Sequence, residues 1–230
     1  MLKQINVFFH SDVGRLVLIA VVLHTFTYFG TRLFTSGWYH YDMTTILDNF
    51  IPLVPWTVVI YLGCYIFWAV NYSLGCTQDK ENAMIFMWTE IIAKAICLVC
   101  YVVIPTTNIR PLIEGTGVFE KAMIWLYSAD AADNLFPSIH CLSSWLCFIA
   151  VRKQERVPKV YKVISVMLAV MICISTLTTK QHVIVDAIGG VLLAELSHKI
   201  APKLLKFMSN YSLGEYAEGK IGKEELDKIL

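Results

Sequence analysis

Residues 160–186, VYKVISVMLAVMICISTLTTKQHVIVD, join a long apolar segment to a short polar one. No charged side chain interrupts residues 163–179. About 20 consecutive apolar residues cross the hydrocarbon core of a bilayer as one helix. The polar residues that follow, from Lys180 to Asp186, are therefore expected where this helix leaves the membrane.

The composition of the whole chain agrees with a membrane location. Hydrophobic residues make up 57% of the 230 residues and charged residues 16%, whereas a soluble domain carries about 25% charged residues. A soluble chain of this length has no core large enough for so many apolar side chains. Seven cysteines, an odd number scattered among apolar runs, do not fit a disulfide scaffold. The net charge of +1 offers no basic surface, so no nucleic-acid partner is expected.

Further apolar windows along the chain extend the pattern to six helices. The predicted spans are 14–34, 52–72, 84–104, 137–152, 160–179 and 183–204. Cytoplasmic loops are enriched in lysine and arginine, and these residues gather after the fourth span and after the sixth. The sequence thus predicts an all-α integral membrane bundle of six transmembrane helices with N- and C-termini in the cytoplasm. The extracytoplasmic side then receives residues 35–50, residues 105–136 and the turn at Lys180.

Two terminal segments are expected to lie outside the bundle. Residues 1–12 combine apolar side chains with Lys3, a pattern typical of a short interfacial helix. Residues 209–230 mix acidic and basic side chains, which indicates a solvated tail. The predicted division is a membrane domain, residues 1–208, and a polar cytoplasmic tail, residues 209–230. The sequence leaves the oligomeric state open.

Several polar residues inside the predicted spans are interpreted as structural. Charges within a membrane are functional candidates by default, but Glu90 and Lys94 lie one turn apart and are expected to neutralise each other inside the bundle. Cys97 and Cys100 have the spacing of a redox or zinc pair, yet they lie among apolar residues, which favours packing. His24 is likewise interpreted as a packing residue.

Three segments on the outer side carry residues suited to phosphate chemistry. The first contains Arg110. In the second, Pro137 is suited to the first turn of a helix, so the Ser138 hydroxyl and the free N–H groups of Ser138, Ile139 and His140 are expected to point at one place. A helix N-terminus of this kind is a ready anion site.

The third segment pairs a histidine with a carboxylate. His182 and Asp186 are four residues apart, so one face of a helix carries both. A carboxylate on one imidazole nitrogen fixes the tautomer and makes the other nitrogen a better nucleophile or base. Lys180 adds a positive charge two residues before His182. Because the predicted topology places Arg110, His140 and His182 on the same side, the sequence predicts one common site.

These motifs resemble the type 2 phosphatidic acid phosphatase superfamily, whose pattern on a six-helix core is K-x6-R-P, then P-S-G-H, then S-R-x5-H-x3-D. The matching residues are Arg110, Pro111, Pro137, Ser138, His140, Ser175, His182 and Asp186. Val103, Ile139 and Thr176 stand where that family has lysine, glycine and arginine. Two of its three phosphate-binding cations are thus missing from their usual places, and Lys180 is the expected substitute.

The resemblance implies a metal-independent lipid phosphatase that needs no cofactor and acts at the extracytoplasmic face. His182 would be the nucleophile that forms a phosphohistidine, Asp186 would orient it, and His140 would act as general acid and then as general base. The residues implied to bind phosphate are Arg110, Ser138, Ile139 and Lys180. The expected partners are a lipid phosphate substrate and membrane lipids.

Two other functions stay open at this point. A phosphotransferase would form the same phosphohistidine and pass the headgroup to a lipid alcohol such as diacylglycerol or ceramide. The sphingomyelin synthase branch, which resembles this superfamily, likewise has fewer of the phosphate-binding cations. A lipid-binding or lipid-translocating bundle would keep these residues in place but would catalyse no reaction. Residues 116–135 are expected to form an amphipathic lid beside the site.

Overall fold

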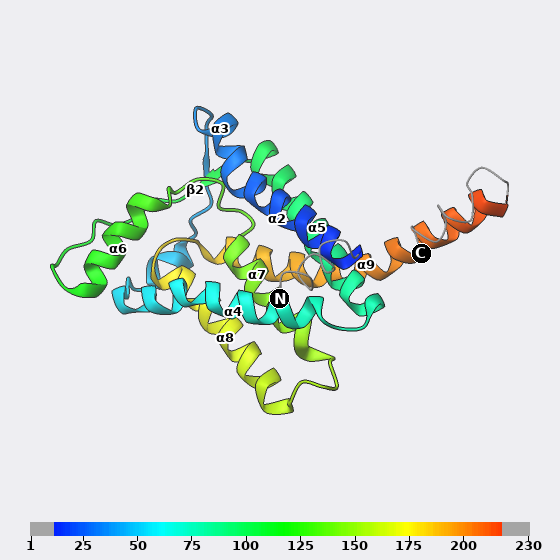
Figure 1. Cartoon of the computed structure of the whole chain (residues 1–230). Coiled ribbons are helices and arrows are strands. Elements are labelled where there is room, and N and C mark those ends of the chain that lie inside the picture. Colours follow the sequence, from blue (N-terminus) through cyan, green and yellow to red (C-terminus); the bar gives the residue numbers. More distant parts are fainter. Residues whose placement is uncertain (1–11, 218–230) are drawn as a thin grey trace, which may run out of the picture.

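The computed structural model describes residues 12–217, and these are almost entirely helical (Figure 1). The helices are α2 (Asp12–Thr25), α3 (Thr31–Thr35), α4 (Val58–Cys76), α5 (Lys80–Val103), α6 (Val118–Ala129), α7 (Ile139–Arg152), α8 (Lys159–Thr178) and α9 (Ile184–Ala217). A π-helical turn, η1 (Phe26–Gly30), joins α2 to α3, and two 3₁₀ turns, η2 (Ile46–Phe50) and η3 (Pro55–Thr57), precede α4. The prediction of an all-α protein is confirmed, apart from one pair of two-residue strands.

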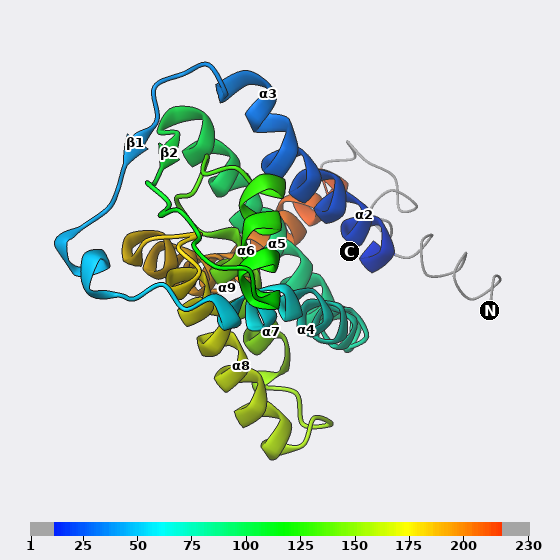
Figure 2. The ribbon, with the colours of Figure 1, turned by 90° about the vertical axis from the view of Figure 1, so that its left-hand side faces the viewer.

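The two strands join loops that lie far apart in the sequence. β1 (Tyr41–Asp42) pairs in parallel with β2 (Thr106–Thr107), with Tyr41 opposite Thr106 (Figure 2). The interfacial helix predicted for residues 1–12 lies outside the described residues except at its last position. The same holds for residues 218–230 of the predicted tail.

Four helical segments are long and apolar enough to cross a membrane. They are Val13–Thr35, Pro55–Cys76, Lys80–Val103 and Lys159–Thr178. They correspond to the first, second, third and fifth spans predicted from the sequence. These segments indicate an integral membrane protein.

The helices at the predicted fourth and sixth spans have a different form. α7 has 14 residues, which is about 21 Å of helix against a hydrocarbon core of about 30 Å. α9 has 34 residues, contains Pro202, and continues past the domain boundary predicted at residue 208 as far as Ala217. Six crossings, cytoplasmic termini and a separate tail therefore stay predictions.

α7 is the central helix of the bundle, since α4, α8 and α9 all pack against it. Its first six residues, from Ile139 to Ser144, are all buried. Leu142, Leu146 and Ile149 recur at helical spacing and form part of the main hydrophobic core. The N-terminal turn of α7 is thereby fixed from several sides at once.

A buried ion pair supports α7 from the side of α5. The Lys94 ammonium lies 3.5 Å from a Glu90 carboxylate oxygen and donates to the Ser143 hydroxyl on α7 at 2.8 Å. The Tyr72 hydroxyl donates to the other Glu90 oxygen at 2.8 Å. Glu90 and Lys94 are both buried, so the interpretation of this pair as mutually neutralised inside the bundle is confirmed.

Gly190 allows α9 to approach the first turn of α7. A Cβ atom at this position would lie 2.5 Å from the carbonyl oxygen of Ser138 and 3.0 Å from the backbone nitrogen of Leu142. Backbone atoms cannot rotate away, so we expect Gly190→Ala to lower the free energy of unfolding by about 1–3 kcal/mol. Unfolding in detergent measures this change.

The matched control is Gly63→Ala on α4, where a Cβ atom would meet no other atom within 4 Å. Alanine is the better helix former by up to about 1 kcal/mol, so Gly63→Ala is expected to unfold no more easily than the parent protein. Equal stability of Gly190→Ala and the parent protein would contradict the close contact between α7 and α9.

Candidate active site

The segment between α8 and α9 is a tight turn. Lys180 has a positive φ of 55°, and the backbone N–H groups of Gln181 and His182 both donate to the carbonyl of Thr176, at 3.0 and 3.1 Å. Asp48, far away in the sequence, accepts a hydrogen bond from the first N–H group of α9 at 2.7 Å. The turn therefore holds Lys180, Gln181 and His182 in fixed positions.

The buried carboxylate of Asp48 stabilises this turn. Burial raises the pKa of the Asp48 carboxyl, but the hydrogen bonds that it accepts from Thr45 and Ile184 outweigh this effect and hold the pKa below its ordinary value. Asp48 is therefore ionised at neutral pH, and its charge favours the N-terminus of α9.

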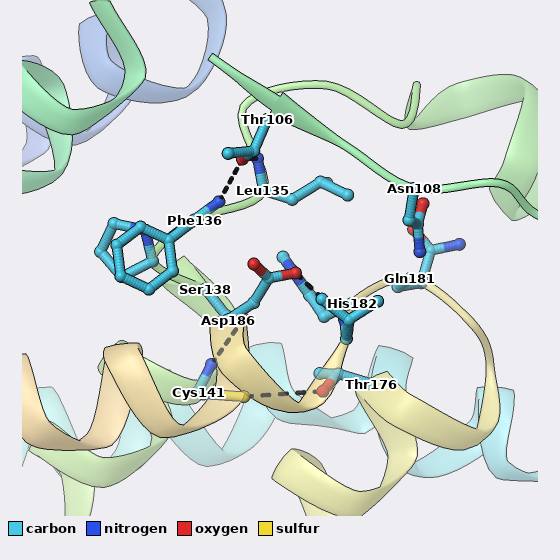
Figure 3. Close-up of polar contacts among 12 residues, drawn as sticks. Thr106, Asn108, Leu135, Phe136, Ser138, Cys141, Thr176, Gln181, His182 and Asp186 are labelled. Atoms are coloured by element: carbon cyan, nitrogen blue, oxygen red, sulfur yellow. Dashed lines mark hydrogen bonds and ion pairs between the residues drawn. The ribbon is translucent and has the colours of Figure 1, made fainter. Parts of the chain in front are cut away.

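His182 and Asp186 lie together, but not on one helical face as predicted, because His182 belongs to the turn before α9 and only Asp186 lies within that helix. Nδ1 of His182 is 3.4 Å from Oδ2 of Asp186 (Figure 3). The same carboxylate oxygen accepts the N–H of Val183 at 3.0 Å. Asp186 is fully buried and His182 is 8% exposed. Nδ1 lies within ion-pair distance of the carboxylate but makes no hydrogen bond among the described residues, and with Nδ1 on the Asp186 side, Nε2 of His182 is the nitrogen left for a substrate.

His140 enters the same place from the first turn of α7. Its ring centroid is 5.9 Å from that of His182, and its Nε2 is buried without a hydrogen-bond partner in the described part of the chain. The N–H of Ser138 donates to the carbonyl of Asp186 at 3.0 Å, which ties the start of α7 to α9. The sequence prediction that these two histidines converge agrees with this geometry.

Arg110 reaches the site from the loop before α6. Its guanidinium donates to the side-chain oxygen of Gln181 at 2.8 Å and to the backbone carbonyl of Asp130, and it lies 5.0 Å from the ring centre of Tyr127. Burial lowers the pKa of Arg110, and the nearby Asp130 opposes this shift. Arginine stays charged under these conditions, so the site holds a positive charge next to the residue that precedes His182.

Gln181 is a residue of the site that sequence reasoning missed. It is 1% exposed, and it lines a small cavity of about 20 Å³ together with His140 and His182. Its amide nitrogen is buried with no partner among the described residues. A buried amide donor without a partner is costly, and an anion in the cavity would satisfy it. The only signal in the sequence is its position directly before His182.

Ser138 and Ile139 form the N-terminus of α7. The Ser138 hydroxyl caps the helix by accepting the N–H of Cys141 at 3.3 Å, and its own N–H is occupied by Asp186. The N–H of Ile139 belongs to the first turn and has no partner within the helix. The predicted anion site at this helix end is therefore best represented by the backbone of Ile139.

Lys180 is directed away from the two histidines. Its ammonium donates to the carbonyl oxygens of Asp48 at 3.0 Å and Ile51 at 2.5 Å, and Lys180 does not line the cavity that His140 and His182 share. Burial lowers the pKa of Lys180, while Asp48 opposes the shift. Its predicted contact with phosphate stays a prediction.

α6 occupies the segment that the sequence predicts as a lid. Met123 and Leu126 are buried and pack against α4 through Val58 and Tyr61. Four large apolar side chains of α6 are exposed, namely Val118, Phe119, Ile124 and Trp125. Figure 1 shows α6 standing at one end of the molecule, beyond the end of α4. The amphipathic helix is present, and its action as a lid stays a prediction.

Together, fold and site define a helical membrane protein with two facing histidines, one paired with a carboxylate, and an arginine beside them. Residues 33–200 match the model of the PAP2 superfamily. The chain belongs to this superfamily, as the motifs predicted. Its members are phosphatases or phosphotransferases. No curated protein and no solved structure matches the chain.

Proposed function

We propose that the protein is a lipid phosphatase that cleaves a phosphomonoester or a diphosphate of a lipid through a phosphohistidine intermediate. The observation that carries this proposal is the placement of His182, next to the buried carboxylate of Asp186, across a cavity from His140. Covalent phosphoryl transfer needs a nucleophile, a carboxylate that orients this nucleophile, and a second group that transfers protons.

In the first step His182 attacks the phosphorus atom. A bond forms between Nε2 and phosphorus while the bond from phosphorus to the leaving lipid oxygen breaks. His140, in its protonated form, gives its proton to that oxygen. Asp186 stabilises the positive charge that develops on the His182 ring, because its carboxylate lies 3.4 Å from Nδ1.

In the second step water hydrolyses the intermediate. His140, now neutral, takes a proton from the attacking water, the nitrogen–phosphorus bond breaks, and inorganic phosphate leaves. A diphosphate substrate would instead release lipid monophosphate and phosphate over the same two steps. The reaction returns both histidines to their starting states without a metal ion.

The phosphoryl oxygens need donors that offset their growing negative charge. Arg110 and the unpaired amide of Gln181 lie at one edge of the site, and the N–H of Ile139 lies at the end of α7. Ser138 supports that helix end as its cap. Lys180 is kept as a candidate ligand, which requires its ammonium to leave the carbonyl groups it now binds.

A second cavity favours a lipid over a soluble phosphate ester. It has a volume of about 450 Å³ and is lined mainly by apolar residues of α2 and α4, with Glu90 and Ser143 also at its wall. Trp68 lines it as well, and the Trp68 ring lies 5.5 Å from that of His140. A hydrocarbon chain in this cavity would end beside the catalytic histidines. We place the site on the extracytoplasmic side, following the distribution of basic residues.

The phosphotransferase remains the second candidate because two family cations are absent. Val103 occupies the lysine position and is 67% exposed, and Thr176 occupies the arginine position with its hydroxyl bonded to the carbonyl of Cys173 at 2.7 Å. A site with fewer cations stabilises less of the negative charge of inorganic phosphate, the product that a phosphatase releases. In this reaction a lipid alcohol replaces water in the second step.

A mass-spectrometric lipid assay of the purified protein, with EDTA present, tests the proposal. The panel contains phosphatidic acid, phosphatidylglycerol phosphate, a polyprenyl diphosphate and a phospho-headgroup lipid, with diacylglycerol and ceramide added as acceptors. We expect free phosphate together with the matching dephosphorylated lipid. A new headgroup lipid without phosphate would establish the transferase. Absence of both products would contradict each enzymatic proposal and favour the lipid-binding bundle.

A further inference from the structure

The hydroxyl of Tyr61 lies between a carboxylate and the general acid. Tyr61 belongs to α4 and is 1% exposed. Its hydroxyl donates to Oδ2 of Asp130 at 3.5 Å and lies 3.3 Å from Nδ1 of His140. The Tyr61 ring also stacks on the imidazole, with centroids 4.5 Å apart. His140 is therefore held by both the ring and the hydroxyl of Tyr61.

Both partners of His140 are fixed by the surrounding helices. Tyr61 packs with Val58 and Met123 where α6 meets α4. Asp130 directly follows α6, and its backbone carbonyl accepts a hydrogen bond from Arg110. The contact between α6 and α4 thus brings the Asp130 carboxylate to the back of His140.

The single hydroxyl proton of Tyr61 decides the tautomer of His140. Because Tyr61 donates that proton to Asp130, its oxygen can only accept from the imidazole. Nδ1 of His140 must then carry a proton. Nε2, which is buried and unpaired in the described part of the chain, is the atom left to exchange a proton with the substrate.

Other titratable groups also surround His140, since Tyr28, Tyr101 and Asp133, which is paired with Arg32, line the same cavity. His182, His24 from α2 and Lys94 from α5 also belong to its electrostatic surroundings. Lys94 is offset by its partner Glu90. Two further rings from α4, those of Tyr65 and Trp68, also face His140. Asp130 is the carboxylate that reaches His140 through one hydroxyl.

We propose that Tyr61 and Asp130 form a positioning pair that fixes the tautomer of His140 and stabilises its protonated form. This inference rests on the proposed function, in which protonated His140 gives its proton to the leaving lipid oxygen. The Tyr61 hydroxyl acts through His140, while Asp130 also lines the cavity that His140 and His182 share. The pair does for the general acid what Asp186 does for the nucleophile.

Tyr61→Phe tests the pair, because phenylalanine keeps the stacked ring and removes the hydroxyl. The protonated form of His140 is needed in the first step, so losing its stabilisation should move the basic limb of the kcat/KM profile to lower pH, by about one unit. The acidic limb of the profile should stay in place. Asp130→Asn should shift the same limb, and the double variant should add little, because the two residues act as one unit.

Tyr65→Phe is the matched control. Tyr65 lies one turn further along α4, and its ring centroid is 6.4 Å from that of His140, but its hydroxyl makes no hydrogen bond to His140 or Asp130 among the residues described. Its profile should equal that of the parent protein. A Tyr61→Phe profile that falls equally at every pH, or does not change, would overturn the positioning role while leaving the phosphatase intact.

A measurement without substrate keeps the two proposals separable. Nitrogen-15 NMR of histidine-labelled protein, with His140 assigned from the His140→Gln spectrum, should show the Nδ1-protonated tautomer in the parent protein and a changed tautomer balance in Tyr61→Phe. Identical imidazole signals in both would overturn the pair, whatever the lipid assay finds. Lack of turnover in the parent protein, with the expected NMR change, would count against the proposed function alone.

Discussion

Replacing His182 with alanine is expected to reduce phosphate release at least about 10⁴-fold, because no other group in the site can take the place of an attacking nucleophile. In the proposed reaction the covalent bond to phosphorus forms at Nε2 of this residue, while Asp186 holds the other ring nitrogen at 3.4 Å. The variant should also fail to trap a phosphohistidine. Lipid labelled in its phosphate and an acid-labile label on the quenched protein measure this intermediate.

The control for this prediction is His198→Ala. His198 lies on α9, about 21 Å along the helix from its first residue, Ile184, and its ring contacts the hydroxyl of Thr89 at 3.4 Å. This variant should keep its activity, and both variants should melt within a few degrees of the parent protein. Phosphate release by a folded His182→Ala protein would disprove the covalent mechanism.

The residues of the site that the sequence could predict are those with a local signature. The short spacing of His182 and Asp186 indicates that they lie close together, although His182 stands two residues before α9, and Pro137, which is expected in the first turn, stands two residues before α7. These relations involve neighbours in the chain, so they are visible without a fold. The buried pair of Glu90 and Lys94 belongs to the same category.

The residues that escaped prediction act through contacts between distant segments. Tyr61 meets His140 across 79 positions of the sequence, and Asp48 binds the first turn of α9 across 136. An isolated tyrosine in an apolar span, or an aspartate in a loop, has no local pattern that distinguishes it. Only the packing of α4, α6 and α7 shows which carboxylate lies behind which histidine.

The fold was likewise predictable where hydropathy alone determines the element. Four predicted spans coincide with long apolar helices, because each has to be apolar over its whole length. α7 is short and buried by neighbouring helices instead, and α9 continues into a polar segment. Hydropathy reports how apolar a segment is and does not report whether lipid or protein covers it.

Lys180 shows that a charge can be predicted from the sequence without the contacts that it makes in the fold. From the sequence, a lysine two residues before the nucleophile is the natural substitute for the missing family cations. The turn with a positive φ at Lys180 directs the ammonium to the carbonyl groups of Asp48 and Ile51 instead. Arg110 and Gln181 occupy the edge of the site in its place.

Removing the charge of Arg110 should therefore cost far more activity than removing that of Lys180. The Arg110 guanidinium binds Gln181, which lines the cavity where the proposed reaction places the phosphoryl group and its developing negative charge. We expect Arg110→Ala to lower kcat/KM about 10²–10³-fold, the usual effect of losing one strong donor to a transition state. Arg110→Lys should recover only part of this loss, because a lysine cannot bind Gln181 and the Asp130 carbonyl with one planar group.

Lys180→Ala, in contrast, should mainly lower stability, because it removes the two hydrogen bonds that tie the α8–α9 turn to the segment around Asp48. Its kcat/KM should fall less than about 10-fold, with a lower melting temperature, since those bonds do not involve the substrate. A loss equal to that of Arg110→Ala, in a protein of unchanged stability, would establish Lys180 as the second phosphate-binding cation. It would mean that substrate draws the ammonium away from its two carbonyl partners, and that the turn rearranges whenever phosphate binds.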